Sequence, residues 1–147
     1  MKTVRMLSII LHLFVGVGAM AGGLACLLDP YAPLGAPVTM LEGSPFDSFL
    51  IPGIILFGLI GIGNVLGGIL FRLHWKYQPY VSGLLGGALV VWIIVQCIIL
   101  RDVVFLHVLF FGFGAVQGCL ALAMLFHQKL FPANIVLRLW DNLRTKH

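Results

Sequence analysis

The chain has 147 residues, of which 61% are hydrophobic and 10% are charged, and its mean hydropathy is +1.08. This composition excludes an ordinary water-soluble domain, because too few polar residues remain to cover its surface. The formal charge of +4 and the pI near 9.3 could suggest a nucleic-acid-binding protein. The basic residues flank long apolar stretches, however, which is typical of membrane helices, so we expect no nucleic-acid partner.

Four apolar stretches organise the chain, and each is long enough to cross a hydrocarbon core of about 30 Å as an α-helix. They run over residues 6–28, 49–71, 79–100 and 103–127. The runs are continuous, whereas strands of a membrane barrel alternate apolar and polar residues. The sequence therefore predicts an all-α fold, an integral membrane four-helix bundle over residues 1–131, followed by a tail over residues 132–147.

The charges predict an orientation for this bundle. Eight of the nine Lys and Arg residues fall on one side when the chain crosses four times, and only Arg101 lies opposite. The first side has a formal charge of +7, and the other has −3 because it also carries Asp29, Glu42, Asp47 and Asp102. Since cytoplasmic loops carry the excess of Lys and Arg, we expect both termini to be cytoplasmic and to lie against anionic lipid.

Glycine pairs are expected to bring the helices together. Each stretch contains one Gly-x-x-x-Gly pair, a spacing that allows close backbone approach in membranes. The pairs are Gly18/Gly22, Gly63/Gly67, Gly83/Gly87 and Gly114/Gly118. The glycine pattern of residues 14–25 recurs in residues 110–121, so we expect the first and last helices to pack together or to form an oligomer seam.

Three polar residues inside the stretches are expected to bridge helices, because each would be costly facing lipid. His12 and Asn64 lie at similar depths in helices that run in opposite directions, so a hydrogen bond between them is predicted. His12 shares a stripe with Ser8, Gly16, Ala19 and Gly23. Gln117 is interpreted in the same way, and a structural role for these bridges is favoured over a proton relay.

A second group of residues would form a pocket near the outer face. Trp92 and Gln96 lie one turn apart, and His107 begins the last stretch at a similar level. With the loop acids they give the candidate pocket Glu42, Asp47, Trp92, Gln96 and His107. The alternative is that Trp92 packs, Gln96 bridges helices and His107 reaches interfacial water.

The outer loop and the tail carry local signals. Ser44, Pro45 and Asp47 predict a capped helix start, and Pro52 predicts a kink or a short interfacial helix. After Pro132, apolar residues recur with helical spacing opposite charged ones, which indicates an interfacial amphipathic helix. The three cysteines contain no Cys-x-x-Cys pair and no metal-ligand spacing, so neither a cofactor nor a metal is implied, and a bound lipid is the one accessory molecule considered.

The segments Leu41–Phe46, Phe49–Gly53 and Val91–Gln96 resemble a group of small bacterial four-helix inner-membrane proteins of unassigned function. The resemblance covers about residues 37–118. It implies a multi-pass protein of the bacterial inner membrane, and it brings no activity, cofactor or catalytic residue.

Three functions are compatible with these features. The first is a non-enzymatic bundle that assembles with itself or with a larger membrane complex, motivated by the glycine pairs. The alternative is binding or transport of a small or lipidic molecule in the outward-facing pocket. The third is an intramembrane enzyme with His107 as base and Asp47 or Asp102 as its partner, which requires these groups within hydrogen-bond reach.

Overall fold

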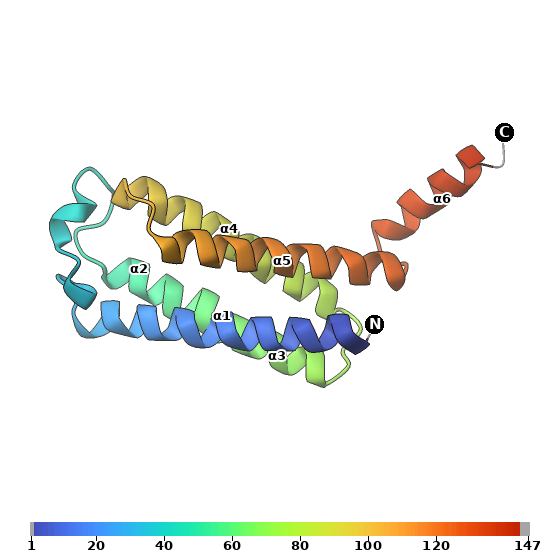
Figure 1. Ribbon diagram of the computed structural model, residues 1–147, viewed down its shortest axis with the longest axis horizontal. Helices are drawn as coiled ribbons and strands as arrows, with labels where there is room; N and C mark the ends of the chain where they lie inside the picture. The colour runs from blue at the N-terminus through green and yellow to red at the C-terminus, as the bar shows by residue number, and fades with distance from the viewer. Residues whose placement is uncertain (1, 145–147) are drawn as a thin grey trace.

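The computed structural model describes residues 2–144, and these residues form helices joined by short connections (Figure 1). The elements are α1 (Lys2–Leu28), η1 (Pro33–Gly35), η2 (Val38–Leu41), α2 (Leu50–Ile54), η3 (Ile55–Ile62), α3 (Gly63–Arg72), α4 (Gln78–Leu100), α5 (Phe105–His127) and α6 (Ala133–Arg144). The elements α2, η3 and α3 follow one another without a break, so the bundle has four long helices.

These four helices are long and apolar enough to span a membrane, which suggests a multi-pass membrane protein. They cover Lys2–Leu28, Leu50–Arg72, Gln78–Leu100 and Phe105–His127, close to the predicted stretches. Large apolar side chains such as Leu13, Leu59, Leu84 and Leu122 are exposed on their outer surfaces. An apolar exterior suits a bundle surrounded by lipid rather than water.

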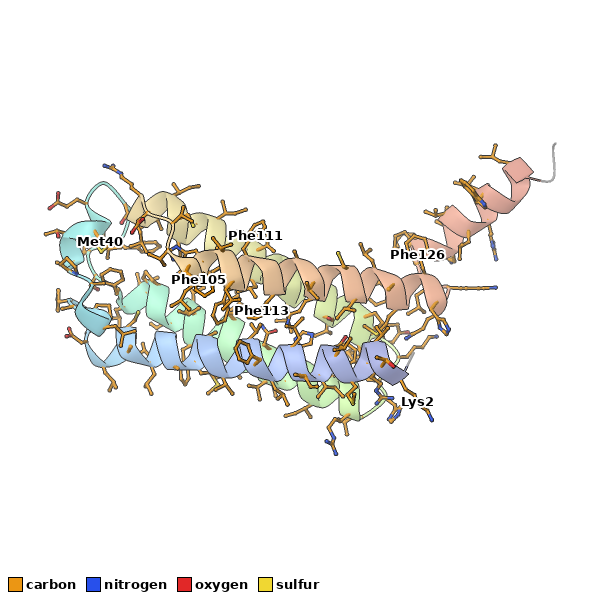
Figure 2. All side chains as sticks on the ribbon, viewed as in Figure 1. Lys2, Met40, Phe105, Phe111, Phe113 and Phe126 are labelled. Carbon is orange, nitrogen blue, oxygen red and sulfur yellow. The ribbon has the colours of Figure 1, made fainter. Side chains whose placement is uncertain are left out.

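The bundle has two chemically different ends. The acidic end, defined as residues 29–49 with residues 101–104, contains Asp29, Glu42, Asp47 and Asp102. The basic end comprises the start of α1, residues 73–77 and residues 128–132. Lys2 lies at the basic end and Met40 at the acidic end (Figure 2).

Two helix pairs build the bundle, and glycines set the closest approach within each pair. In the first pair, a Cβ on Gly23 would lie 2.6 Å from the Phe57 backbone nitrogen, so α1 fits tightly against η3. In the second, a Cβ on Gly86 would lie 2.8 Å from the Gly114 carbonyl oxygen, so α4 fits tightly against α5. Of the predicted pairs, Gly114 makes such an approach, whereas Gly87 and Gly118 meet nothing within 4 Å.

The contact between the two pairs is made by side chains. A Cβ on Gly18 of α1 would meet the Phe110 ring of α5 at 2.7 Å, and Phe14 packs edge-on against Phe113 with ring centroids 5.3 Å apart. The first and last helices therefore meet as expected, but through aromatic rings rather than through backbone contact.

The second long helix changes its winding. It begins at Leu50, and η3 is a π-helical segment that returns to α-helical winding at Gly63. Pro52 lies in the first turn, where its missing N–H leaves no ladder bond to break. The irregularity near Pro52 thus takes the form of altered winding, and such π-segments are frequent at functional sites.

The predicted helix start at Ser44 and Pro45 is wrong. The helix begins five residues later, with Phe49 as its N-cap and no side-chain cap bond. Ser44 Oγ instead accepts a hydrogen bond from the Phe46 N–H at 3.2 Å, and the Phe49 N–H donates to the Pro30 carbonyl at 2.8 Å. This bond across the loop, together with the burial of Leu41 and Phe49, determines where the helix begins.

The tail forms α6, which projects from the basic end away from the bundle (Figure 1). The Tyr80 hydroxyl of α4 donates to the Phe131 carbonyl at 2.6 Å and so holds the connection before α6. Apolar side chains of α6 are exposed, including Ile135, Val136, Leu139, Trp140 and Leu143. Residues 145–147 of the predicted tail lie outside the described residues.

Candidate functional site

Each of the four long helices contributes one polar side chain to a cluster inside the bundle. The members, called the polar tetrad below, are His12 of α1, Asn64 of α3, Ser82 of α4 and Gln117 of α5. His12 and Asn64 are 0% exposed, and Ser82 and Gln117 are 1% exposed. His12 also lies against the Phe71 ring, with ring centroids 5.5 Å apart.

Hydrogen bonds connect all four members. His12 Nδ1 lies 2.7 Å from Asn64 Oδ1, which matches the pairing expected from depth, and His12 Nε2 lies 2.9 Å from Ser82 Oγ. Gln117 Nε2 donates to Asn64 Oδ1 at 2.8 Å. Asn64 Nδ2 donates to the Ile60 carbonyl at 2.8 Å, close to the point where η3 returns to α-helical winding.

These partners assign the protons of the tetrad. Because the Ile60 carbonyl requires a donor, the Asn64 amide must direct its oxygen toward His12 and Gln117. His12 Nδ1 therefore carries a hydrogen and donates, and the lone pair of Nε2 accepts from the Ser82 hydroxyl. The contact of 3.1 Å between Gln117 Nε2 and His12 Nδ1 then joins two donors, so it is not a hydrogen bond.

The tetrad can hold helices together, but its burial leaves no access for a ligand. One acceptor, Gln117 Oε1, is buried and has no partner within the described residues. Interhelical hydrogen bonds in membranes contribute about 0.6 kcal/mol each on average, so several bonds through one amide make Asn64 the most consequential member. The sequence pattern did not indicate Ser82, although it is a polar residue at the tetrad's depth on α4, between Val81 and Gly83.

A pocket lies nearer the acidic end, between the two helix pairs. This acidic-end pocket has a volume of about 180 Å³ and contacts α1, η3, α4 and α5. Its lining is apolar apart from Gln96 and His107, and it comprises Gly18, Ala19, Gly22, Leu56, Leu89, Ile93, Gln96, Val104, Leu106, His107 and Phe110. A cavity with few polar groups in an apolar wall is typical of small-molecule sites.

His107 has a defined orientation in this wall. It occupies the third position of α5, and its Nδ1 accepts a hydrogen bond from the Val104 N–H at 3.4 Å. Since Nδ1 accepts, the neutral ring carries its hydrogen on Nε2. His107 is 8% exposed and lines the pocket, so a ligand that accepts hydrogen bonds would find a donor here.

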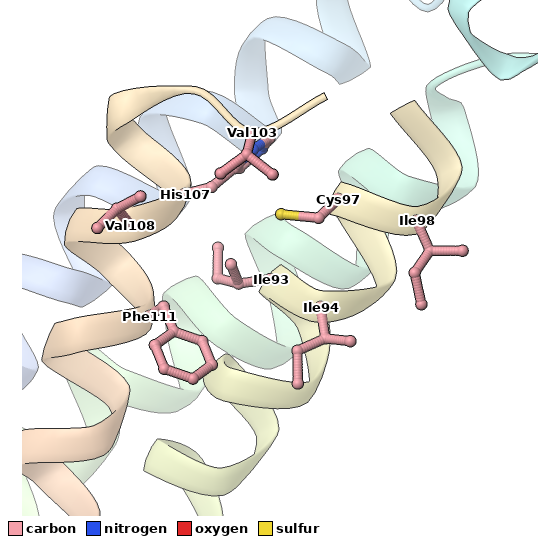
Figure 3. Close-up of a pocket in the computed structure, with 8 residues that line it drawn as sticks. All are labelled: Ile93, Ile94, Cys97, Ile98, Val103, His107, Val108 and Phe111. Carbon is pink, nitrogen blue, oxygen red and sulfur yellow. The ribbon is translucent and has the colours of Figure 1, made fainter. Parts of the chain in front are cut away.

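A second pocket shares His107 and Ile93 with the first. It has a volume of about 360 Å³, lies between α4 and α5, and is lined by apolar side chains together with Cys97 and His107 (Figure 3). The volume of this second pocket falls within the range of about 300–1,000 Å³ that is common for small-molecule sites. His107 therefore lines both pockets.

The candidate pocket residues are only partly brought together. Gln96 and His107 line the acidic-end pocket, and Gln96 also shares a small cavity of about 20 Å³ with Trp92, whose Nε1 is buried without a partner in the described residues. Glu42 and Asp47 are exposed in the loop and do not line the acidic-end pocket.

The acid–base pair required for the enzymatic hypothesis is not formed. Asp102 Oδ1 accepts from the Val103 N–H at 2.7 Å, and His107 Nδ1 is occupied by the Val104 N–H. Among residues 2–144, neither Asp102 nor Asp47 forms a hydrogen bond with His107.

The chain matches no protein-family model, and comparison with curated proteins and with solved structures finds no match. The fold and the site define its class directly. Over the part of the chain that the structure describes, it is an all-helical protein with four candidate membrane spans, a buried polar tetrad and an apolar pocket nearer the acidic end.

Proposed function

We propose that this protein is a non-enzymatic membrane protein that binds a small apolar or lipidic molecule in the acidic-end pocket. The observation that supports the proposal is the donor pair Gln96 and His107 in an otherwise apolar cavity between the helix pairs. The ligand would place its chain among Leu56, Leu89 and Ile93. Its polar end, a carboxylate or carbonyl oxygen, would accept hydrogen bonds from His107 Nε2 and the Gln96 amide.

The two halves of the bundle suit this role differently. The polar tetrad joins all four helices on the basic-end side of the acidic-end pocket, which holds the helices together at that level. Toward the acidic end the helix pairs are joined by aromatic side chains, and the Phe110 ring lies over Gly18 at the pocket. A ring can change rotamer at lower cost than backbone can move, so this half can open and close around a ligand.

The proposed location is the bacterial inner membrane, with both termini in the cytoplasm. The distribution of Lys and Arg supports this orientation through the positive-inside rule. The acidic-end pocket would then open toward the outer leaflet, and α6 would lie along the cytoplasmic surface with its apolar side chains in the headgroup region.

Photo-crosslinking with a fatty acid that carries a diazirine at its chain end tests the binding role. The full-length protein in nanodiscs should crosslink within α1, α4 and α5 around the pocket. Gly22→Leu should fill the cavity and abolish this labelling, because a Cβ at Gly22 meets only Leu56, at 3.4 Å. Gly112→Leu is the matched control, since Gly112 meets nothing within 4 Å. Equal labelling of both variants would contradict the proposal.

Assembly with a second copy or a larger membrane complex is a second candidate. The supporting observation is that Gly87 and Gly118 belong to Gly-x-x-x-Gly pairs, but a Cβ at either would meet nothing within 4 Å among residues 2–144. If they serve an interface, Gly87→Leu should shift the oligomer distribution in gentle detergent toward monomer. A wild-type protein that is monomeric in nanodiscs would remove this candidate.

A further inference from the structure

A pocket at the basic end gathers donors from three helices. It has a volume of about 310 Å³ and is lined by Lys2 and Arg5 of α1, Gln78 of α4, Met124 and His127 of α5, and Gln128. Two of these residues, Lys2 and Arg5, carry a formal positive charge. The pocket therefore offers a concentration of positive charge and N–H donors at one end of the bundle.

No carboxylate of the chain before residue 130 lies near this charge. Asp29, Glu42, Asp47 and Asp102 all belong to the acidic end, a full helix length away. Arg5 is held in place because its Nη2 donates to the carbonyl oxygens of Phe71 and Arg72 at the end of α3. A fixed guanidinium with further donors is well suited to phosphate, whose oxygens accept several hydrogen bonds at once.

Gln78 gives an independent indication of a ligand. It is 8% exposed, its Oε1 is buried without a partner in the described residues, and it lines the pocket. A buried amide usually has hydrogen-bond partners, so an unpartnered one in the wall of a pocket requires an explanation. Rotation of the amide by half a turn would direct its N–H donors at an anion.

An apolar groove runs between α1 and α5, two of the three helices that line this pocket. The groove has a volume of about 350 Å³ and is lined by α1 from Leu7 to Phe14 and by α5 from Phe113 to Leu120. On α5, Leu120 of the groove and Met124 of the pocket lie four residues apart and therefore on the same face of the helix. The seam between α1 and α5 is thus cationic at its end and apolar along its length.

We infer that this seam binds an anionic phospholipid, with the phosphate in the basic pocket and one acyl chain in the groove. The charge of the pocket selects an anionic headgroup over a zwitterionic one. The apolar groove favours a lipid over a soluble phosphate, because a lipid can place an acyl chain in the groove whereas a free phosphate would leave it empty. This site lies at the opposite end of the bundle from the acidic-end pocket and is independent of it.

Native mass spectrometry of the full-length protein tests the inference with three probes: phosphatidylglycerol, phosphatidylcholine and inorganic phosphate. Phosphatidylglycerol should be retained in preference to phosphatidylcholine, and inorganic phosphate should not displace it. Equal retention of the two lipids would overturn the inference. Displacement by inorganic phosphate would show a phosphate site without a lipid role, and would overturn it equally.

Variants connect the binding to this seam. Lys2→Gln should weaken phosphatidylglycerol binding about fivefold, because a Lys near an anionic surface contributes about 1 kcal/mol. Gln78→Leu should weaken it further. Arg101→Gln changes the net charge equally at the acidic end and should have no effect. Val116→Trp should fill the groove and reduce lipid retention. Equal behaviour of Lys2→Gln and Arg101→Gln, in proteins with unchanged thermal unfolding, would refute the assignment.

Discussion

His12 Nδ1 of α1 donates a hydrogen bond to Asn64 Oδ1 of α3 over 2.7 Å, and both side chains are completely buried. The same Asn64 oxygen accepts from Gln117, and the same His12 ring accepts from Ser82. One amide and one imidazole therefore connect the two helix pairs. This relationship predicts unequal contributions of the tetrad members to stability.

Asn64→Leu should be the most destabilising substitution in the tetrad. It removes the acceptor for His12 Nδ1–H and Gln117 Nε2–H and leaves both donors buried without partners. A buried unsatisfied group costs about 1–3 kcal/mol, so the free energy of unfolding should fall by at least this amount. Steric trapping in bicelles measures this free energy of unfolding. Asn134→Leu on α6 is the control and should change the unfolding free energy little; equal losses for both would refute the role of the tetrad.

Gln117→Met should lower the free energy of unfolding much less than Asn64→Leu does. Gln117 donates one hydrogen bond to Asn64, but its Oε1 is already unpartnered, so replacing the amide removes an unsatisfied acceptor together with the bond. We expect the free energy of unfolding to change by no more than about 1 kcal/mol, since replacing a polar group by an apolar one of similar shape can be nearly neutral. A loss as large as that of Asn64→Leu would contradict the proton assignment.

Neighbouring glycines on α4 should respond differently to alanine. A Cβ at Gly86 would lie 2.8 Å from the Gly114 carbonyl oxygen, which is backbone and cannot rotate away, whereas Gly87 meets nothing within 4 Å. Gly86→Ala should therefore separate α4 from α5 and lower the unfolding temperature. Gly87→Ala should leave it unchanged or raise it slightly, because Ala favours a helix over Gly. A lower unfolding temperature for Gly87→Ala than for Gly86→Ala would show that α4 turns a different face toward α5.

Cysteine labelling tests the proposed orientation. In a background without Cys26, Cys97 and Cys119, Ser48→Cys should react with a membrane-impermeant maleimide in intact cells or spheroplasts. His74→Cys, in the connection between α3 and α4, should react only after permeabilisation. Labelling of His74→Cys alone in intact cells would show that the termini lie outside.

The sequence predicts the four long helices well, because a long continuous apolar run can form few structures other than a helix. It also predicts the buried face of α1, where small and polar residues recur with helical period: Ser8, His12, Gly16, Ala19 and Gly23. That stripe is confirmed as buried. The start of the second long helix was not predictable from Ser44 and Pro45, because a distant bond between Phe49 and Pro30 determines it.

In the candidate site, too, some features follow from the local sequence and others depend on how distant helices pack. Depth along each helix placed His12 level with Asn64 and Gln96 near His107. It did not indicate Ser82 as a partner, since that depends on how α4 is rotated about its axis. Glycine spacing likewise does not say which neighbour a glycine faces: Gly86 makes a close contact outside any predicted pair, whereas Gly87 within one makes none.

A high-resolution map of the full-length protein in nanodiscs made from native lipid tests the central claim most directly. We predict elongated density in the acidic-end pocket beside Gly22 and Ile93, with its polar end within hydrogen-bond distance of His107 Nε2 and the Gln96 amide. A pocket closed by Phe110 and neighbouring side chains, with no density beside His107, would contradict the account.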